Sequence, residues 1–373
     1  MARRRSIPRQ STVTAASPAT MNPIYSLANA INSFFTSPST VTRQQCDEFA
    51  VSLVGEPVIP APIQGAFSYT VIAGPTQARI VQFRAQNSVL NMVILNLAQA
   101  IYGQFVAACT YHGTIGQSLP LSVYVIEKLP GIAYIQARCL YGLSTNPSLE
   151  VASRQSNTVV DLARYIIPVL LQDELNLWDR FFAVSWKHRQ TLLCNVVEAI
   201  HHDYKQKFDL LSQALPSRFA ENLRRVRAEL SLLFTSTHPL VLSHDDLCEM
   251  NIFVDPNTGH ITGIIDWAEA SILPFGISLW GFENILGYMD SQGWHYHDNR
   301  HELEDLFWQT FEVTVGGISE ADRQAIHVAR TAGFFLRYGF VWEDGVREVP
   351  AKESDSGLRY LDAFCTTGDG DLL

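Results

Sequence analysis

Short apolar runs separated by glycine and proline dominate residues 58–126 and predict β-strands. β-branched and aromatic residues are concentrated in these runs, as is typical of strands bounded by turns. The three expected strands are Ser68–Ile72, Ile80–Phe83 and Ser122–Ile126. Between the second and third, apolar residues recur three and four positions apart from Leu90 to Ile101, which indicates one face of a helix. This region is therefore predicted to form a small β-rich lobe with one helix packed against its sheet.

After residue 151 the apolar pattern changes to long helical periods. Apolar residues lie three or four positions apart in each period, and the expected helices are Val159–Leu171, Thr191–Phe208, Arg218–Phe234, Arg300–Val315 and Ala321–Tyr338. One interruption, Leu240–Trp267, has the pattern of a loop followed by a β-hairpin. The predicted fold class is α+β, with a β-rich N-terminal lobe and a larger, mainly helical C-terminal lobe.

The interruption contains a hairpin with polar residues at its open end. Its turn, residues 255–259, is Asp-Pro-Asn-Thr-Gly and is flanked by apolar runs. Proline fixes φ, while asparagine and glycine tolerate positive φ, so this segment predicts a tight turn between two strands. Asn251 enters the first strand and Asp266 leaves the second. Closing the hairpin brings a carboxamide and a carboxylate together, and this geometry predicts a cation site.

Mg²⁺ is the cation that suits these side chains. It prefers hard oxygen ligands, keeps several waters, and is held by few protein side chains together with the phosphates of a nucleotide. Asp266 and Asn251 are therefore the predicted metal ligands. Asp246 lies five residues before Asn251 on the preceding loop. From there it could meet a hydroxyl or amine that attacks a phosphoryl group, so it is the predicted general base.

The pattern His244-x-Asp246-x-x-x-x-Asn251, followed fifteen residues later by Asp266-Trp267, resembles the motif of the aminoglycoside phosphotransferase and choline kinase family. It resembles the catalytic loop of protein kinases more distantly. The resemblance implies a two-lobed protein-kinase-like fold and a small-molecule phosphotransferase, of the fungal type, that uses ATP and Mg²⁺. It also implies that Asp246 is catalytic, that Asn251 and Asp266 bind the metal, and that His244 supports the loop. It spans residues 60–345, and its specific part is residues 244–266.

The resemblance also implies a nucleotide site in the N-terminal lobe. Gly65 would bend the chain before the first expected strand, and backbone N–H groups up to Ser68 would face phosphate oxygens. Arg84 stands where the family has a phosphate-binding cation, although an arginine at a strand end is also common as a surface charge. The segment from Tyr124 to Gly131 resembles the linker between the lobes, and its backbone around Glu127 to Leu129 would hydrogen-bond the adenine.

The sequence departs from the family pattern in two places. The family usually has glycine where Asp245 stands. A carboxylate there would raise the pKa of Asp246 by like-charge repulsion, or it would point to solvent. Kinases also pair their phosphate-binding lysine with a glutamate on the following helix, but the helix expected at Val89–Tyr102 contains no acidic residue.

These features divide the chain into four parts: a flexible tail with one short helix around Tyr25–Phe35 (1–45), a nucleotide-binding N-terminal lobe (46–130), a catalytic and substrate-binding C-terminal lobe (131–365) and a final tail (366–373). The first 46 residues contain no Asp or Glu and several Arg. This composition resembles a mitochondrial presequence. A disordered tail is the leading interpretation, with targeting as the alternative.

Composition limits the possible partners and location. A formal net charge of −10 argues against a general nucleic-acid binder, because phosphate backbones are held by clustered cations. The six cysteines lie far apart without a CxxC pair, which indicates reduced thiols in a cytoplasmic protein. No apolar run is long enough to span a membrane. A small molecule is therefore the expected partner, while the oligomeric state stays open.

Other patterns leave alternatives open. Four residues after the hairpin lie where the family builds its acceptor pocket, although large apolar side chains are more often core residues: Trp280, Glu283, Trp294 and Trp308. His297 and His301 have a helical spacing that could ligate a metal. The favoured interpretation is a substrate-facing loop that caps a helix through Asp298 or Asn299.

Two alternatives to phosphoryl transfer also remain. The lack of an acidic partner on the first helix is compatible with a pseudokinase or nucleotide-binding module that has lost transfer. The same residues are compatible with a kinase-like fold redirected to other chemistry on a natural product.

Overall fold

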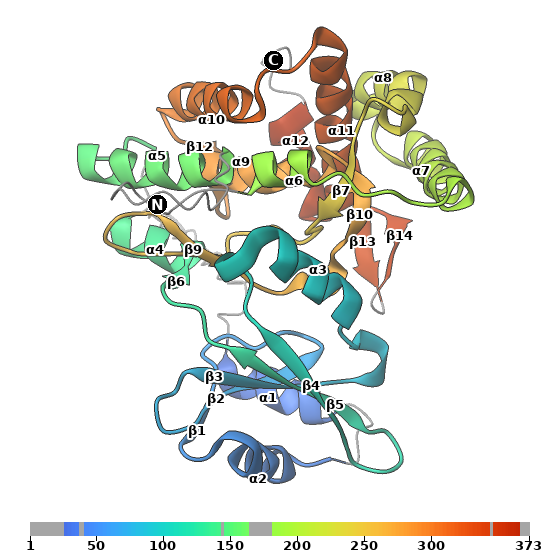
Figure 1. Cartoon of the computed structure of the whole chain (residues 1–373). Helices are drawn as coiled ribbons and strands as arrows, with labels where there is room; N and C mark the ends of the chain where they lie inside the picture. The colour runs from blue at the N-terminus through green and yellow to red at the C-terminus, as the bar shows by residue number, and fades with distance from the viewer. Residues whose placement is uncertain (1–25, 37–40, 143–144, 164–180, 344–345, 366–373) are drawn as a thin grey trace, which may run out of the picture.

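The computed structural model describes residues 26–36, 41–142, 145–163, 181–343 and 346–365. Two lobes are visible in Figure 1, with a β-sheet and its helices at the bottom and a larger, mainly helical part above. The fold class predicted from the sequence, α+β with a β-rich first lobe and a helical second lobe, is confirmed.

The N-terminal lobe is built on a five-stranded antiparallel sheet in the order β1-β2-β3-β5-β4. Its strands are β1 (Val58–Pro60), β2 (Ser68–Ala73), β3 (Arg79–Arg84), β4 (Cys109–Ile115) and β5 (Leu121–Glu127). Ser68 pairs with Arg84, which in turn pairs with Ser122. Because side chains alternate across a strand, these three share one face. The opposite face carries the fully buried rings of Tyr69 and Phe83.

Helices α1 (Leu27–Thr36) and α2 (Arg43–Val54) cover the face of the sheet that carries Tyr69. Thr42 caps α2 with its side chain in a capping box, which satisfies backbone N–H groups of the first turn. The Tyr69 hydroxyl donates to Asp47 Oδ1 (2.8 Å) and accepts from Arg43 Nε (3.1 Å). The core of this lobe thus includes residues before position 46, and the boundary expected there falls inside α2.

Helix α3 (Met92–Tyr102) lies between the sheet and the C-terminal lobe (Figure 1). It begins at Met92, three residues later than expected, because the Asn91 side chain accepts the N–H groups of Val93 and Ile94 (3.1 and 3.3 Å) as an N-cap. At its other end the Tyr102 hydroxyl donates to the backbone oxygen of Leu242 (3.2 Å). The helix therefore ties the two lobes together.

The linker after β5 leads into a second sheet, in the order β6-β8-β9. Its strands are β6 (Ile132–Ala133), β8 (Ile252–Val254) and β9 (Ile261–Ile264). The Thr262 hydroxyl donates to Pro130 O (2.7 Å). Gly131 has a φ of 88° and a Cβ there would lie 2.5 Å from Val254 O, so only glycine fits this close approach. The linker is thus packed directly on the predicted hairpin.

The rest of the C-terminal lobe consists of helices with short strand pairs between them. The helices are α4 (Tyr134–Tyr141), α5 (Leu149–Ala163), α6 (Phe182–Lys187), α7 (Cys194–Ala214), α8 (Ala220–Glu229), α9 (Trp280–Leu286), α10 (Arg300–Val315), α11 (Glu320–Tyr338) and α12 (Gly357–Cys365). The paired strands are β7 (Leu240–Ser243) with β10 (Ser271–Pro274), β11 (Gly287–Met289) with β12 (Trp294–Tyr296), and β13 (Phe340–Glu343) with β14 (Val346–Pro350).

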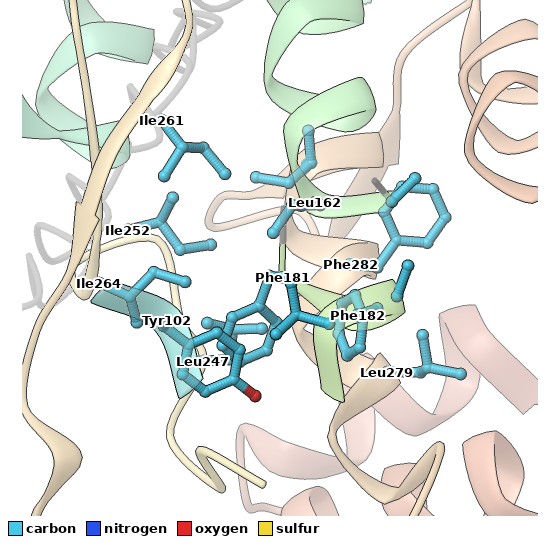
Figure 2. Close-up of a cluster of buried hydrophobic side chains, with 14 of the residues drawn as sticks. Tyr102, Leu162, Phe181, Phe182, Leu247, Ile252, Ile261, Ile264, Leu279 and Phe282 are labelled. Carbon is cyan, nitrogen blue, oxygen red and sulfur yellow. The ribbon is translucent and has the colours of Figure 1, made fainter. Parts of the chain in front are cut away.

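A buried apolar cluster fixes the hairpin to this helical lobe (Figure 2). Ile252 and Ile264 of the hairpin, Tyr102 of α3, Leu162 of α5 and Phe282 of α9 all belong to it, and each is buried. Burial of such side chains stabilises the fold by about 1.5–3 kcal/mol each. The two strands that carry the polar motif are therefore held by the main core of the protein.

Of the helices predicted from the sequence, α10 has the expected bounds and α11 begins one residue earlier. Helix α5 is described from Leu149 to Ala163, and the remainder of the expected Val159–Leu171 helix lies outside the described residues. Among the described helices, none is both long enough and apolar enough to cross a membrane.

Candidate functional site

The hairpin brings Asn251 and Asp266 to the same end. Ile252 stands opposite Ile264 in the antiparallel pair, and Ile265 N–H donates to Asn251 O (2.9 Å). Asp266 therefore follows directly after the residue that faces Asn251. At the closed end, Asp255 Oδ1 accepts the N–H of Asn257 (2.7 Å), an Asx turn that the Asp-Pro-Asn sequence favours.

Asn251 also contacts Asp246 on the preceding loop. Its amide nitrogen Nδ2 donates to Asp246 Oδ2 (2.9 Å) and to Asp246 O (2.8 Å). The amide nitrogen of Asn251 is thus hydrogen-bonded to Asp246. Its amide oxygen Oδ1 is the atom of this side chain that can bind a cation. The second carboxylate oxygen, Asp246 Oδ1, accepts from Arg337 Nη2 (2.6 Å). The Asp246 side chain keeps 24% of its surface exposed.

His244 holds the loop against the far strand of the hairpin. Its Nε2 lies 2.8 Å from Ile265 O, and its Nδ1 accepts the N–H of Asp246 (3.3 Å). These contacts require a neutral ring protonated at Nε2. The burial of the ring also favours the neutral form, because desolvation lowers the pKa of His244. The hydrogen bond to Ile265 O and the nearby aspartates raise this pKa, but they only partly offset the effect of burial. The ring also packs edge-on against Trp267 (4.7 Å between centroids).

Asp266 has left-handed backbone angles (φ 58°, ψ 61°) at the residue before a short 3₁₀ turn. Aspartate tolerates this conformation better than most side chains. Its side chain is 44% exposed, and one carboxylate oxygen lies 3.8 Å from Arg84 Nη1 of the N-terminal lobe. A carboxylate and the Asn251 amide oxygen are hard donors, so this donor set fits Mg²⁺ with its remaining ligands from phosphates and water.

Arg84 is buried rather than a surface charge, with 6% of its surface exposed. Nε donates to Ser88 O (2.6 Å) and Nη1 to Gln82 Oε1 (3.1 Å). Burial lowers the pKa of this guanidinium, and the charge of Asp266 opposes that effect. Helix α3 supplies no acidic partner, as its sequence indicates. A backbone oxygen and a glutamine position the arginine instead.

The loop before β2 is closed by a buried glutamine. The side chain of Gln64 pairs with the backbone of Thr70 through both its oxygen and its nitrogen (2.8 Å each). Gly65 follows as an exposed residue. Ser68 is buried, and its hydroxyl accepts from Gln82 Nε2 (3.3 Å). The loop therefore lies beside the same polar face of the sheet as Arg84.

In the linker between the lobes, two backbone groups are already engaged. Glu127 N–H donates to Ala108 O (2.9 Å) and Lys128 N–H to Ala78 O (3.0 Å). The Glu127 side chain forms an exposed ion pair with Arg79 (2.9 Å). A Cβ on Gly263 of β9 would clash with the Leu129 side chain, so Leu129 lies directly on the hairpin. Along the chain, the Leu129 N–H follows the two hydrogen-bonded N–H groups of Glu127 and Lys128.

Arg337 is the site residue that sequence reasoning did not find. It comes from the last turn of α11, and its guanidinium lies 4.4 Å from the ring centroid of the buried Trp280. Burial opposes its charge, but the Asp246 carboxylate raises the pKa of Arg337 above its ordinary value. Arginine in the last turn of a helix is a general preference, and nothing in the local pattern pointed to the loop 91 residues away.

The other aromatic and acidic residues noted after the hairpin have structural partners. Glu283 is buried and ion-paired with Arg330, and Trp308 is buried in the core beside Phe311. Trp294, half-buried in β12, packs on aromatic rings of α12. Trp280 lies beneath Arg337, beside the loop.

The histidine-rich segment contains a strand rather than a single loop, because residues 294–296 form β12. Asn299 occupies the N-cap position of α10, but its side chain donates to Gln155 Oε1 (3.2 Å) instead of capping the helix. Within the part of the chain that the structure describes, no three His, Cys, Asp or Glu residues form a metal-binding group. The alternative of a transition-metal site at His297 and His301 has no support.

Comparison with solved structures finds similar chains at low identity. One is an aminoglycoside 3′-phosphotransferase of type VIII (16% identity, TM-score 0.43, covering 77% of this chain and 98% of that chain). Another is an aminoglycoside phosphotransferase from Streptomyces rimosus in complex with ADP and streptomycin (12%, 0.43, 77% and 96%). A third is a macrolide 2′-phosphotransferase from Brachybacterium faecium (13%, 0.44, 79% and 92%).

No curated protein matches the sequence. Residues 77–282 match the model of the phosphotransferase enzyme family, and this segment covers more than half of the 373 residues. The match contains β3, the linker between the lobes and the whole polar motif of the hairpin. The chain therefore belongs to the phosphotransferase enzyme family.

Proposed function

We propose that the protein transfers the γ-phosphoryl group of ATP to a hydroxyl group of a small molecule, with Mg²⁺ as the metal. One observation carries this proposal: Asp246, Asn251 and Asp266 converge at the hairpin end, and Arg84 of the other lobe approaches to 3.8 Å of Asp266. A base, two oxygen ligands and a phosphate-binding cation are the parts that phosphoryl transfer requires.

Asp246 is the proposed catalytic residue. Asn251 and Arg337 fix the orientation of its carboxylate, and His244 fixes the loop that carries it. The acceptor hydroxyl donates its proton to this carboxylate as its oxygen bonds to the γ-phosphorus, and the bond between that phosphorus and the bridging oxygen of ATP breaks. The products are ADP and a phosphate ester. Positioning and charge stabilisation supply most of the rate gain in such reactions.

Asn251 Oδ1 and the Asp266 carboxylate are the proposed Mg²⁺ ligands. When bound, the ion would neutralise charge on the β- and γ-phosphates. Arg84 would bind phosphate oxygens with the donors it directs toward Asp266. Backbone N–H groups from Gly65 to Ser68 would cover the phosphates, and the linker at Glu127 and Leu129 would hydrogen-bond the adenine.

A pseudokinase is the alternative function, because α3 has no acidic residue to hold a phosphate-binding cation. Arg84 is held by Ser88 O and Gln82 instead, and it reaches the proposed metal ligand Asp266. This arrangement supports nucleotide binding without an acidic residue on α3, and the accessible Asp246 carboxylate at the same end of the hairpin supports transfer. All six cysteines are free, which supports the proposal that the enzyme works in the cytoplasm.

Replacement of the proposed base tests the function. Asp246→Asn keeps the size of the side chain but replaces one accepting oxygen by an NH₂ donor and removes the group that takes the proton, so the rate of acceptor-dependent ADP release should fall about 10²–10⁴-fold. Thermal stabilisation by ATP with Mg²⁺ should remain. Asp266→Asn is the matched variant of the proposed Mg²⁺ ligand. It should lose the part of the thermal stabilisation by ATP that depends on Mg²⁺. Unchanged ADP release by Asp246→Asn would contradict the proposal.

A further inference from the structure

Arg337 lies where an acceptor has to approach the proposed base. Its Nη2 contacts Asp246 Oδ1 at 2.6 Å, while Asn251 contacts Oδ2. A hydroxyl that reaches this carboxylate therefore comes next to the guanidinium. The two side chains keep 20% and 24% of their surfaces exposed. The ion pair is thus accessible from outside the protein.

The position of this guanidinium is fixed by regular structure. Arg337 belongs to the 19-residue helix α11, which begins with a capping box at Ser319. Its charged group lies over the ring of Trp280, which is 1% exposed. An arginine clamped between an aromatic face and a carboxylate has little freedom to move away when a ligand binds.

The guanidinium has more hydrogen-bond donors than its contacts use. Arginine carries five N–H donors in a planar fork. Two contacts are made in the described structure, one to Asp246 Oδ1 and a long one from Nη1 to Asp245 O (3.5 Å). Such a fork matches the oxygens of a carboxylate or phosphate and repels a cation.

We infer that the acceptor carries an oxyanion, a carboxylate or a phosphate, close to the hydroxyl that is phosphorylated, and that Arg337 binds it. This inference rests on the proposed function, because it assigns the acceptor to the base at Asp246. Arg337 is then a specificity-determining residue that selects anionic acceptors and disfavours cationic ones. It also keeps the Asp246 carboxylate oriented before the acceptor binds.

Matched acceptors test the inference through kinetics. Glycerate and gluconate are compared with their primary amides, and glycerol 3-phosphate with glycerol, by ADP release. The wild type should prefer the anionic member of a pair. Arg337→Gln should lower kcat/KM for that member about 10–100-fold more than for the neutral one, the range of a charged hydrogen bond. Arg337→Lys should restore part of the preference. An equal loss for both members would mean that Arg337 only orients Asp246, and would overturn the inference.

A binding measurement decides the question even if none of these compounds is phosphorylated. The thermal shift caused by inorganic phosphate and by acetate is measured at constant ionic strength, with and without ADP and Mg²⁺. The control is Arg323→Gln on the same helix, whose arginine pairs with Glu312. The anion shift should be smaller in Arg337→Gln than in wild type and Arg323→Gln, and the two anions distinguish a phosphate from a carboxylate preference. Equal shifts in all three proteins would overturn the inference, whereas a missing ADP shift would count against the proposed function alone.

Discussion

Two aspartates of the site, Asp245 and Asp266, have left-handed backbone angles, with φ of 52° and 58°. This conformation is open to glycine without cost and to aspartate or asparagine at a modest one. It explains why the family usually has glycine at the position of Asp245. In this chain the Asp245 charge lies near the buried Tyr204 hydroxyl, whose pKa is raised by burial first and by Asp245 second. The departure from the family thus keeps the backbone shape of the loop and adds a charge.

Protonation of His244 should lower the stability of the folded protein in acid. Its pKa in the folded protein is below the ordinary 6.5, because the ring is buried in its neutral form. The unfolded chain therefore binds a proton first as the pH falls. The stabilising effect of the neutral ring is complete above pH 6.5 and is lost as the pH falls from there toward the folded pKa.

We expect the melting temperature of the wild type to fall as the pH is lowered below 6.5. His244→Gln, which has no titrating ring, should melt lower at neutral pH but lose less on acidification. Differential scanning fluorimetry across this pH range measures both slopes. Parallel curves for the two proteins would show that the ring does not remain neutral in the folded state.

The residues of the motif could be found from the sequence because their geometry is local. His244, Asp246 and Asn251 lie on one loop, and a turn with clear glycine and proline chemistry brings Asp266 back to it. Arg337 could not be found in this way, because its contact depends on how α11 packs against the loop. The fungal type stays a prediction, and the sequence did not indicate the identity of the acceptor.

At the level of elements, the hairpin depends on a glycine at its turn. Gly259 has a φ of 78°, and a Cβ there would clash with the backbone oxygen of Arg154 in α5. α5 also donates to the turn, from Asn157 Nδ2 to Thr258 O (2.8 Å) and from the Thr158 hydroxyl to Gly259 O (2.6 Å). The closed end of the hairpin is thus docked on a helix, which holds the open end in register.

Gly259→Ala should destabilise the protein more than Gly316→Ala. Gly316 has a similar φ of 87° but open space around a Cβ, so that variant bears the backbone strain alone, about 1 kcal/mol. Gly259→Ala adds the steric clash and should lose about 1–3 kcal/mol more. Urea unfolding measures both values. Equal losses would mean that the turn can move away from α5 at no cost.

The elements that the sequence predicted well are those with one apolar face. In α10 and α11 the buried apolar residues recur three or four positions apart, and the bounds of both helices were close to the expected ones. α9 was not predicted, because all seven of its residues are buried and no periodicity marks a solvent face. β10, β11 and β12 are four residues or fewer, too short to show an alternating pattern.

At the scale of the whole molecule, Arg84 connects the lobes at the site. It belongs to the N-terminal sheet, yet its charge lies 3.8 Å from the Asp266 carboxylate of the C-terminal lobe. Tyr102 and the linker add further contacts between the lobes. A nucleotide bound between Arg84 and Asp266 would therefore contact both lobes and stabilise them together.

Arg84→Gln should raise the Michaelis constant for ATP about 10–100-fold, because it removes charged hydrogen bonds to phosphate. The control is Arg79→Gln on the same strand, an exposed arginine that pairs with the side chain of Glu127. Adenine would contact the backbone of the linker, so this variant should leave the constant unchanged. Steady-state kinetics with varied ATP at saturating Mg²⁺ measures the difference. Identical constants for the two variants would exclude phosphate binding by Arg84.

The helices on the outer face of the N-terminal sheet determine where the protein can be shortened. Cys46 and Ala50 of α2 and Phe34 of α1 are buried in one cluster with Tyr69. A version starting at residue 46, the boundary that the sequence pattern suggests, would uncover the rings of Tyr69 and Phe83 on the outer face of the sheet and remove Arg43 from the Tyr69 hydroxyl. Expression designs for crystallisation should therefore begin ahead of Leu27, so that α1 and α2 continue to cover the apolar face of the N-terminal sheet.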